Sequence, residues 1–480
     1  MIFNSFTFVV FLAIVLPLYY VLSRRGQNVL LLVSSYVFYG WWDYRFTSLL
    51  LLSTVIDYWA AIVIDRASSP ARKKLALSVS MAFNLGTLCF FKYFNFFLDS
   101  TIAALQAFGF QVDALTLNVI LPVGISFYTF QTMSYTIDVY RGQCHVARSL
   151  LDFAVYVAFF PQLVAGPIER AFHLLPQVER ERRIDSVMVI DGIWLIVLGY
   201  LKKTVIADRI AEYSDQAYSS GLLPFEGIGN WLCLYAFAIQ IYGDFSGYSD
   251  IARGLSKIMG FDLMVNFRAP YLVSNPPAFW QNWHISLSTW LRDYLYIPLG
   301  GNRGGTAKMY RNLMITMLLG GLWHGAAWAY LIWGAYQGAL LVVHRALLPA
   351  LHRVDGALEQ SRWSGTLWRV GCTIVFFHLT CIGWLIFRAG STPSGTDQLL
   401  LVSDALRTLF TPEAFTGFSS MGRSLLFTGV LTFLVQWKAP VMDSFHAWRP
   451  WPQAVSVACG MLLVTALGVF DGTQFIYFQF

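Results

Sequence analysis

Charged side chains are scarce in this 480-residue chain, where Asp, Glu, Lys and Arg together make up 12% of the residues. A typical soluble domain has roughly 25%. Hydrophobic residues make up 56%, and the mean hydropathy is +0.55. A soluble protein of this size needs more charged residues on its surface than this chain contains. The composition therefore excludes an ordinary cytosolic enzyme, a disordered chain and a disulfide-stapled secreted module, and it predicts a polytopic membrane protein.

The chain also lacks the patterns that hold metal ions and disulfides. Its six cysteines show no Cys-x-x-Cys spacing and most lie in apolar runs, so we expect neither a zinc site nor a disulfide framework. The net charge of +6, from 33 basic and 27 acidic residues, is modest. This charge is scattered along the chain, and we therefore predict no nucleic-acid partner. From the cysteine spacing, no residue is assigned to a bound metal.

Long apolar runs recur along most of the sequence. A spanning helix needs about 20 mostly apolar residues. The pattern predicts an all-α fold of about ten to twelve transmembrane helices, although some of the runs are too short to cross alone. The first run is not interpreted as a cleavable signal, because Pro17 interrupts it and no basic region precedes it. The expected spans are residues 6–22, 29–42, 46–64, 75–97, 117–135, 151–165, 187–206, 231–242, 313–344, 367–387, 425–437 and 454–470.

Basic residues between the early runs indicate how the chain is oriented in a lipid bilayer. Loops rich in Lys and Arg stay on the cytoplasmic side. Arg24 and Arg25 follow the first run, Arg141 and Arg148 follow the fifth, and further basic residues follow the third. The intervening loops are poor in positive charge. Alternation therefore places the N-terminus outside the cytoplasm.

The stretch 255–306 does not have the pattern of a simple span. It contains four prolines and a glycine-rich run at 300–305, together with Trp280, Trp283 and Trp290. Irregular backbone near a bilayer is tolerated only where protein or a wet cavity surrounds it. We therefore expect short amphipathic or re-entrant helices that form part of a site.

His324 is the strongest candidate for chemistry. It lies among apolar and small residues at the expected depth of the membrane, where an ionisable residue is costly and indicates a function. Burial favours the neutral imidazole, which can accept a proton, and the small neighbours would let a substrate approach. The alternative is a structural histidine bonded to another helix. His284, flanked by tryptophans, is a weaker candidate, and His378 is interpreted as a satisfied core histidine.

Acidic residues in the apolar runs have two interpretations. Asp244 and Asp250 lie at the end of a run, where acid–base work is one interpretation. Helix termination, with pairing to a nearby arginine, is the favoured interpretation. Asp57, inside the third run, is expected to pair in the same way.

The C-terminal residues 475–480 alternate aromatic side chains up to the terminal carboxylate. One interpretation is an aromatic anchor at the membrane interface, where Tyr and Trp collect. The other is a mobile tail that presents the Tyr477 phenol to a buried site. The pattern alone favours the anchor.

Three segments together resemble the membrane-bound O-acyltransferase family. They are residues 283–294, which begin with Trp283 and His284, residues 298–303, and residues 321–328, which contain Trp323 and His324. The similarity is to the bacterial branch that includes alginate and peptidoglycan O-acetyltransferases and the D-alanyl transferase of teichoic acids. Further segments agree with this branch, namely residues 34–42, 91–95, 165–170, 244–250 and 383–388.

The resemblance implies roles for residues of these segments. His324 would be the catalytic residue and His284 the second polar member of the active site. The chain departs from its relatives at Gln281 and Asn282, where two arginines are common, so any contact with donor phosphate falls to arginines further along. The residues assigned to substrate binding are Trp283, Trp323, Arg292, Arg303 and Asp244.

The resemblance also implies an architecture. A ring of helices would surround a central tunnel that crosses the bilayer, with the acyl donor entering from one side and the acceptor from the other. Residues 1–480 would form a single membrane-embedded domain, with the site segment 255–306 and a tail at 471–480. The tail is similar to a C-terminal acyl motif, which implies that Tyr477 receives the acyl group and passes it on.

The implied function is transfer of an acyl group, expected to be acetyl, from a cytoplasmic thioester to an extracytoplasmic polysaccharide such as alginate. The donor would be acetyl-CoA, another acyl-CoA or an acyl-carrier thioester, used as a substrate, with no permanently bound cofactor. A separate extracytoplasmic acetyltransferase protein is expected to finish the transfer. The expected location is the bacterial inner membrane, with both termini extracytoplasmic.

The mechanism that follows uses His324 as the general base that takes a proton from the acceptor hydroxyl. His284 or a backbone N–H would then stabilise the oxyanion. A rival hypothesis is a transporter or flippase for an acyl donor or a glycan, with His324 and Asp244 in a proton path. Such proteins often contain paired repeats, and the sequence shows none. A third hypothesis is a scaffold that only anchors a polymer-export complex.

Overall fold

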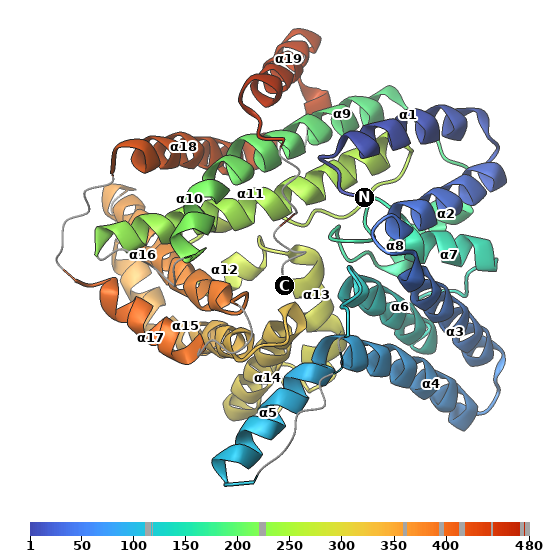
Figure 1. Cartoon of the computed structure of the whole chain (residues 1–480), viewed down its shortest axis with the longest axis horizontal. Helices are drawn as coiled ribbons and strands as arrows, with labels where there is room; N and C mark the ends of the chain where they lie inside the picture. The colour runs from blue at the N-terminus through green and yellow to red at the C-terminus, as the bar shows by residue number, and fades with distance from the viewer. Residues whose placement is uncertain are drawn as a thin grey trace. The chain divides into compact units, whose positions relative to one another are not determined.

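The protein is built from helices that fall into two compact units. The computed structural model describes residues 1–110, 117, 119–219, 227–358, 362–392, 398–411, 418–442, 445–470 and 475, and this described part contains no β-strand (Figure 1). The first unit comprises Met1–Ile193 and Ala252–Met264, and the second comprises Trp194–Ile251 and Val265–Phe480. The expectation of an all-α polytopic membrane protein is confirmed.

Several helices are long and apolar enough to cross a bilayer on their own. Among the described residues there are five such stretches, namely Tyr44–Arg66, Pro70–Ala107, Trp328–Leu358, Trp363–Ala389 and Pro450–Leu467. The full number of spans, the ring around a tunnel, the single domain and the orientation of the termini stay predictions.

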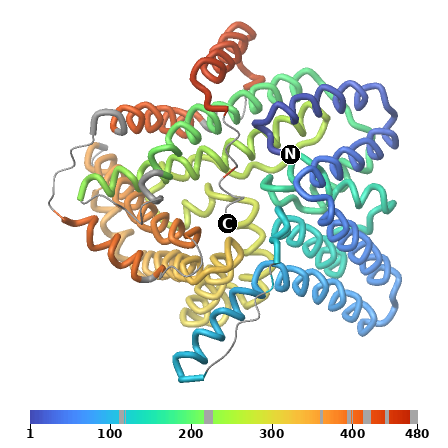
Figure 2. The backbone as a smooth tube through the Cα atoms, in the orientation of Figure 1, coloured from blue at the N-terminus to red at the C-terminus, as the bar shows by residue number. Residues whose placement is uncertain are grey.

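The first unit begins with helices that follow the expected runs closely. Helix α1 starts after Ser5, whose hydroxyl accepts a hydrogen bond from the N–H of Phe8 at 3.2 Å. This bond satisfies one of the N–H groups that have no partner within the helix. Helices α3, α4 and α6 contact one another, and their backbones lie close together in Figure 2. The elements are α1 (Phe6–Val21), α2 (Arg24–Gly40), α3 (Thr47–Arg66), α4 (Pro70–Leu88), the π-helix η2 (Cys89–Tyr93), α5 (Phe94–Ala107), α6 (Ile125–Tyr140), α7 (Leu150–Ala158) and α8 (Ala171–Glu179).

Asp57 is fully buried where α3, α4 and α6 meet. Its carboxylate accepts hydrogen bonds from the Ser80 hydroxyl at 2.5 Å and from the Asn84 amide at 2.8 and 3.0 Å. The expected arginine partner was wrong, because neutral donors on α4 surround this carboxylate in the described structure. Buried polar groups need such partners, since an unmade hydrogen bond costs about 1–3 kcal/mol.

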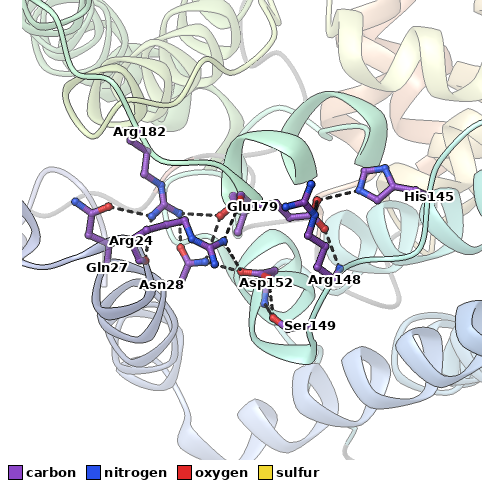
Figure 3. Close-up of polar contacts among 10 residues, drawn as sticks. Arg24, Gln27, Asn28, His145, Arg148, Ser149, Asp152, Glu179 and Arg182 are labelled. Carbon is purple, nitrogen blue, oxygen red and sulfur yellow. Dashed lines mark hydrogen bonds and ion pairs between the residues drawn. The ribbon is translucent and has the colours of Figure 1, made fainter.

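A polar network joins α2, α7 and α8 of the first unit (Figure 3). Asp152, at the start of α7, accepts from Asn28 at 2.7 Å and from Ser149 at 2.6 Å. Glu179, at the end of α8, accepts from the N–H of Arg148 at 2.9 Å and lies 2.9 Å from the His145 ring. Both carboxylates are buried, so these bonds hold the three helices and the 141–149 loop in one arrangement.

The second unit contains most of the segments that resemble the acyltransferase family. Its helices include two that the apolar runs did not reveal, α10 and α17, just as α8 of the first unit was missed. Its elements are the end of α9 (Ser186–Tyr200), the π-helix η3 (Leu201–Ala207), α10 (Asp208–Ser219), most of α11 (Ile228–Ile258), α14 (Thr306–His324), α15 (Trp328–Leu358), α16 (Arg362–Ala389), α17 (Gln398–Thr408), α18 (Phe418–Met442) and α19 (Pro450–Leu467).

The expected span 313–344 is two helices, and this prediction of a single run was wrong. Helix α14 ends at His324 and α15 begins at Trp328, and the two pack side by side (Figure 1). A Cβ at Gly334 would lie 2.4 Å from the carbonyl oxygen of Met317, and one at Gly325 would lie 2.0 Å from the Tyr330 ring. The glycines at these positions therefore allow close packing within the protein. The approach of a substrate past the small neighbours of His324 stays a prediction.

This packing predicts the effect of adding one methyl group. Gly334→Ala places a Cβ against the backbone of α14, so we expect a lower midpoint of thermal unfolding in detergent. Overpacking of this kind costs about 1–3 kcal/mol. Gly371→Ala is the matched control, because a Cβ at Gly371 of α16 meets nothing within 4 Å. Equal midpoints for the two variants would contradict the close approach of α14 and α15.

Candidate functional site

Short helical segments of the second unit hold the first candidate histidine. The α12 segment begins after Asn275, whose side chain accepts from the N–H of Ala278 at 2.9 Å, and Pro276 occupies its first position. Proline and a capping asparagine are typical of a helix start. The segments are the 3₁₀-helix η4 (Pro270–Leu272), α12 (Pro276–Trp280), α13 (Ile285–Leu291) and the π-helix η5 (Arg292–Tyr296).

His284 precedes α13 in a left-handed backbone conformation, with φ 42° and ψ 55°. It is the one described residue other than glycine with a positive φ. This conformation costs a residue with a Cβ roughly 1–2 kcal/mol. Such strain persists only where the surroundings enforce it, and it is common at functional sites. Here the N–H of Ile285 donates to the Asn266 carbonyl at 2.9 Å, which fixes the turn.

Asn266 also orients the imidazole of His284. Its side-chain oxygen lies 3.2 Å from His284 Nδ1 and accepts from the Ser286 hydroxyl at 2.9 Å. The backbone N–H of Ser286 can only donate, and its bond to this oxygen at 3.2 Å defines the amide orientation; the amide nitrogen then donates to the Ser249 hydroxyl at 3.2 Å. Since the oxygen is an acceptor, it selects the tautomer with the proton on Nδ1. Burial lowers the pKa of His284 to about 3, so the ring is neutral at physiological pH.

His324 is the last residue of α14 and is 5% exposed. Its ring makes edge contacts with Trp333 of α15 and Phe387 of α16, at centroid distances of 5.1 and 5.3 Å. The centroid of the His284 ring lies 6.4 Å away. Residues separated by 40 positions in the sequence are thus brought together, with three helices and the turn before α13 contributing to one buried site.

The tryptophans assigned to substrate binding belong to an aromatic cluster around the two histidines. Trp283 stacks on Phe279 at 5.7 Å and contacts Trp384 at 4.7 Å. Trp323 contacts both rings, with centroids 5.0 Å from His324 and 5.8 Å from His284. Aromatic packing of this density removes water from the site, which strengthens electrostatic interactions inside it. The role of either tryptophan in binding a substrate stays a prediction.

The two arginines assigned to substrate binding lie at the surface of the second unit. Arg292 is more than half exposed and pairs with its neighbour Asp293 at 2.7 Å. Arg303 lies exposed in the glycine-rich turn before α14. Neither arginine is part of the buried aromatic cluster, and their contact with a donor phosphate stays a prediction.

Asp244 lies in the middle of α11 and forms a buried ion cluster. Lys203 of η3 donates to Asp244 at 2.5 Å and to Asp208 at 2.8 Å. Asp250 pairs in the same way with Lys202 at 2.5 Å. The expected helix end was wrong, since α11 continues to Ile258, and the partners are lysines where arginines were expected. Pairing of buried carboxylates with cations avoids the cost of an isolated buried charge.

Tyr477, the candidate acyl carrier, lies outside the described residues, and so does most of the 471–480 tail. Phe475 is described, and its ring is buried. It makes an edge contact with Tyr248 at 4.8 Å and lies over the Lys203 ammonium at 4.3 Å. The side chain two positions before Tyr477 is therefore seated in the second unit beside the Lys203 cluster.

Several residues around the histidines were not singled out in the sequence. Asn266, Trp333, Trp384 and Phe387 all contact the site, as the distances above show. Trp384 and Phe387 lie in a segment that resembles the family, so that segment was the available signal. No pattern marked Asn266 or Trp333. Among the described residues, no group of three His, Cys, Asp or Glu side chains has the arrangement of a metal site.

His378 was interpreted as a satisfied core histidine; its hydrogen bonds agree, but the residue is half-buried and lines a groove, so its place in the core was wrong. Its Nε2 lies 2.8 Å from the Tyr235 hydroxyl and its Nδ1 lies 2.7 Å from the Ile374 carbonyl oxygen. Both ring nitrogens therefore have partners, which suits a structural role.

Comparison with known proteins identifies the chain. The sequence profile of the membrane-bound O-acyltransferase family matches residues 146–387. The probable alginate O-acetylase AlgI of Pseudomonas putida is 45% identical over 395 residues, which cover 81% of this chain and 77% of the relative. A peptidoglycan O-acetyltransferase of Helicobacter pylori is 33% identical over 413 residues, covering 79% and 75%. A teichoic acid D-alanyltransferase of Bacillus subtilis is 28% identical over 283 residues, covering 56% and 69%. The chain is therefore an acyltransferase, and it belongs to the membrane-bound O-acyltransferase family.

Proposed function

We propose that this protein is an O-acetyltransferase that moves an acetyl group from a cytoplasmic thioester to an extracytoplasmic polysaccharide, with alginate as the first acceptor to test. The proposed donor is acetyl-CoA and the proposed location is the bacterial inner membrane. The similarity to alginate O-acetylases over most of the chain supports the acceptor class. The observation that carries the proposal is the approach of the His284 and His324 rings to 6.4 Å inside the aromatic cluster.

In the proposed reaction, His324 is the general base. A neutral ring nitrogen takes the proton from the acceptor hydroxyl as the oxygen attacks the thioester carbonyl carbon. The carbon–oxygen bond forms, the carbon–sulfur bond breaks, and the imidazolium returns its proton to the leaving thiolate. The surrounding Trp333 and Phe387 exclude water, which would otherwise hydrolyse the thioester.

The tautomer of His284 argues against the role of oxyanion donor that the sequence suggested for it. With the proton on Nδ1, held by Asn266, its Nε2 carries a lone pair. A lone pair accepts a hydrogen bond and does not donate one to an oxyanion. The single proton of the acceptor hydroxyl goes to His324, so we assign His284 to accepting a hydrogen bond from another donor of the bound substrate. We assign the oxyanion to a backbone N–H, the other candidate that the sequence left open.

Tyr477 is proposed as the first acceptor. A phenol has an unperturbed pKa of about 10, so it loses its proton more readily than a sugar hydroxyl. The aryl ester that forms is also a more reactive donor for the next transfer. The buried Phe475 supports this role, because it fixes the chain two residues before the phenol.

Replacement of His324 tests the assigned base. We expect His324→Ala to lower O-acetylation of the polysaccharide by about 10²–10⁴-fold, the usual contribution of general-base catalysis. The measurement is ester content of the polymer in cells and labelled acetyl transfer in membranes. His344→Ala, on the same unit in α15, is the matched control and should leave the activity unchanged. Retained activity in a folded His324→Ala protein would remove this residue from the chemistry.

Replacement of Tyr477 separates an acyl carrier from an aromatic anchor. Tyr477→Phe keeps the ring and deletes the hydroxyl, so we expect acetyl transfer to stop while the protein still inserts. Mass spectrometry of C-terminal peptides after incubation with acetyl-CoA should find an acetyl ester in the parent protein only. Tyr44→Phe removes a hydroxyl from an exposed tyrosine and serves as the control. Normal activity of Tyr477→Phe would leave the tail as an anchor.

A further inference from the structure

The second unit carries an apolar groove that the proposed reaction does not use. It has a volume of about 680 Å³ and lies between α11, α16, α18 and η4. Pockets of 300–1,000 Å³ are the size that holds a small organic ligand. Its walls are mainly aliphatic and aromatic, with the contributions of Ile239, Leu272, Val370, Ile374, Phe377 and Phe433.

One arginine lines this mainly apolar groove. Arg369 lies on α16, six residues inside the candidate span that begins at Trp363. Its Nε–H donates to the Gly365 carbonyl oxygen at 3.2 Å, and no carboxylate pairs with it in the part of the chain that the structure describes. Arginine in a span is costly unless it reaches the interface or finds a partner. Trp363, 80% exposed, marks the interface about 1.7 turns away.

The groove is long as well as apolar. Its lining residues extend from Arg369 to His378 along α16 and from Leu425 to Gln436 along α18. At a rise of 1.5 Å per residue, these stretches measure about 14 Å and about 16 Å. An elongated apolar wall with a cation near the interface fits a chain with an anionic head. We propose that the groove binds one anionic phospholipid, with its phosphate on Arg369 and an acyl chain along α16 and α18.

The same groove shares a wall with the candidate active site. Tyr271 lines it, donates to the Ala238 carbonyl at 2.7 Å and accepts from the Trp384 indole at 3.1 Å. The Tyr271 ring stacks against that of Trp283, with the two centroids 6.2 Å apart, and Trp283 directly precedes His284 in the chain. A bound lipid therefore packs against a residue that positions the aromatic cluster, and it would support the geometry around His284.

Two substitutions test the lipid site by different routes. Arg369→Gln removes the charge from an exposed side chain, and Arg353→Gln on α15 is the matched control outside the groove. Gly429→Phe fills the groove from α18. A Cβ at Gly429 meets only the Ile239 side chain, at an ordinary contact distance of 3.7 Å, so the backbone can accept the change.

The measurement is native mass spectrometry of the full-length protein in detergent with phosphatidylglycerol or phosphatidylcholine. We expect the parent and Arg353→Gln to retain phosphatidylglycerol about fivefold more strongly than phosphatidylcholine, because one interfacial cation contributes about 1 kcal/mol. Arg369→Gln should abolish this preference, and Gly429→Phe should abolish retention of both lipids. The binding readout does not depend on acyl transfer, so it separates this site from the proposed function.

Several outcomes would overturn the lipid site. The parent protein could bind both lipids equally, or Gly429→Phe could retain them. Displacement of the lipid by glycerol phosphate alone would identify a soluble phosphate ligand instead. Displacement by a long-chain acyl-CoA would assign the groove to an acyl donor.

Discussion

The site depends on keeping two imidazoles out of water while holding them at a fixed separation. His284 and His324 are 0% and 5% exposed, and aromatic rings surround both. A buried imidazole favours its neutral form, which is the form that accepts a proton. The low dielectric that keeps it neutral also strengthens hydrogen bonds to a developing charge. Acyl transfer between a thioester and a hydroxyl needs both properties, because water competes for the same acyl carbon.

Precision at the site comes from backbone packing on either side of it. The close approach of Gly334 to Met317 locks α14 against α15 and thereby sets the end of α14 where His324 lies. On the other side, Asn266 bonds both the backbone beside His284 and its ring. The strained conformation of His284 persists because these bonds enforce it. Neither histidine has the freedom of a loop residue, which suits a reaction that needs exact distances.

Much of this site could be predicted from the sequence, because each local segment around the two histidines resembles a known family. The helical class followed from the apolar runs, which can be identified in each local segment without knowledge of tertiary contacts. What failed depends on tertiary contacts. The break between α14 and α15 is hidden because residues 313–344 are apolar throughout. The role of Asn266 and the lysine partners of Asp244 and Asp250 arise from residues distant in sequence, and no local pattern records such pairs.

The most direct test of the account is a structure of the protein bound to a thioether analogue of acetyl-CoA. The account predicts that the carbon replacing the thioester carbonyl lies beside the rings of His324 and His284, inside the aromatic cluster. One of these ring nitrogens should then lie within about 3–3.5 Å of an acceptor oxygen placed for attack. An analogue bound outside the aromatic cluster, with Trp333 and Phe387 still closed over His324, would contradict the account.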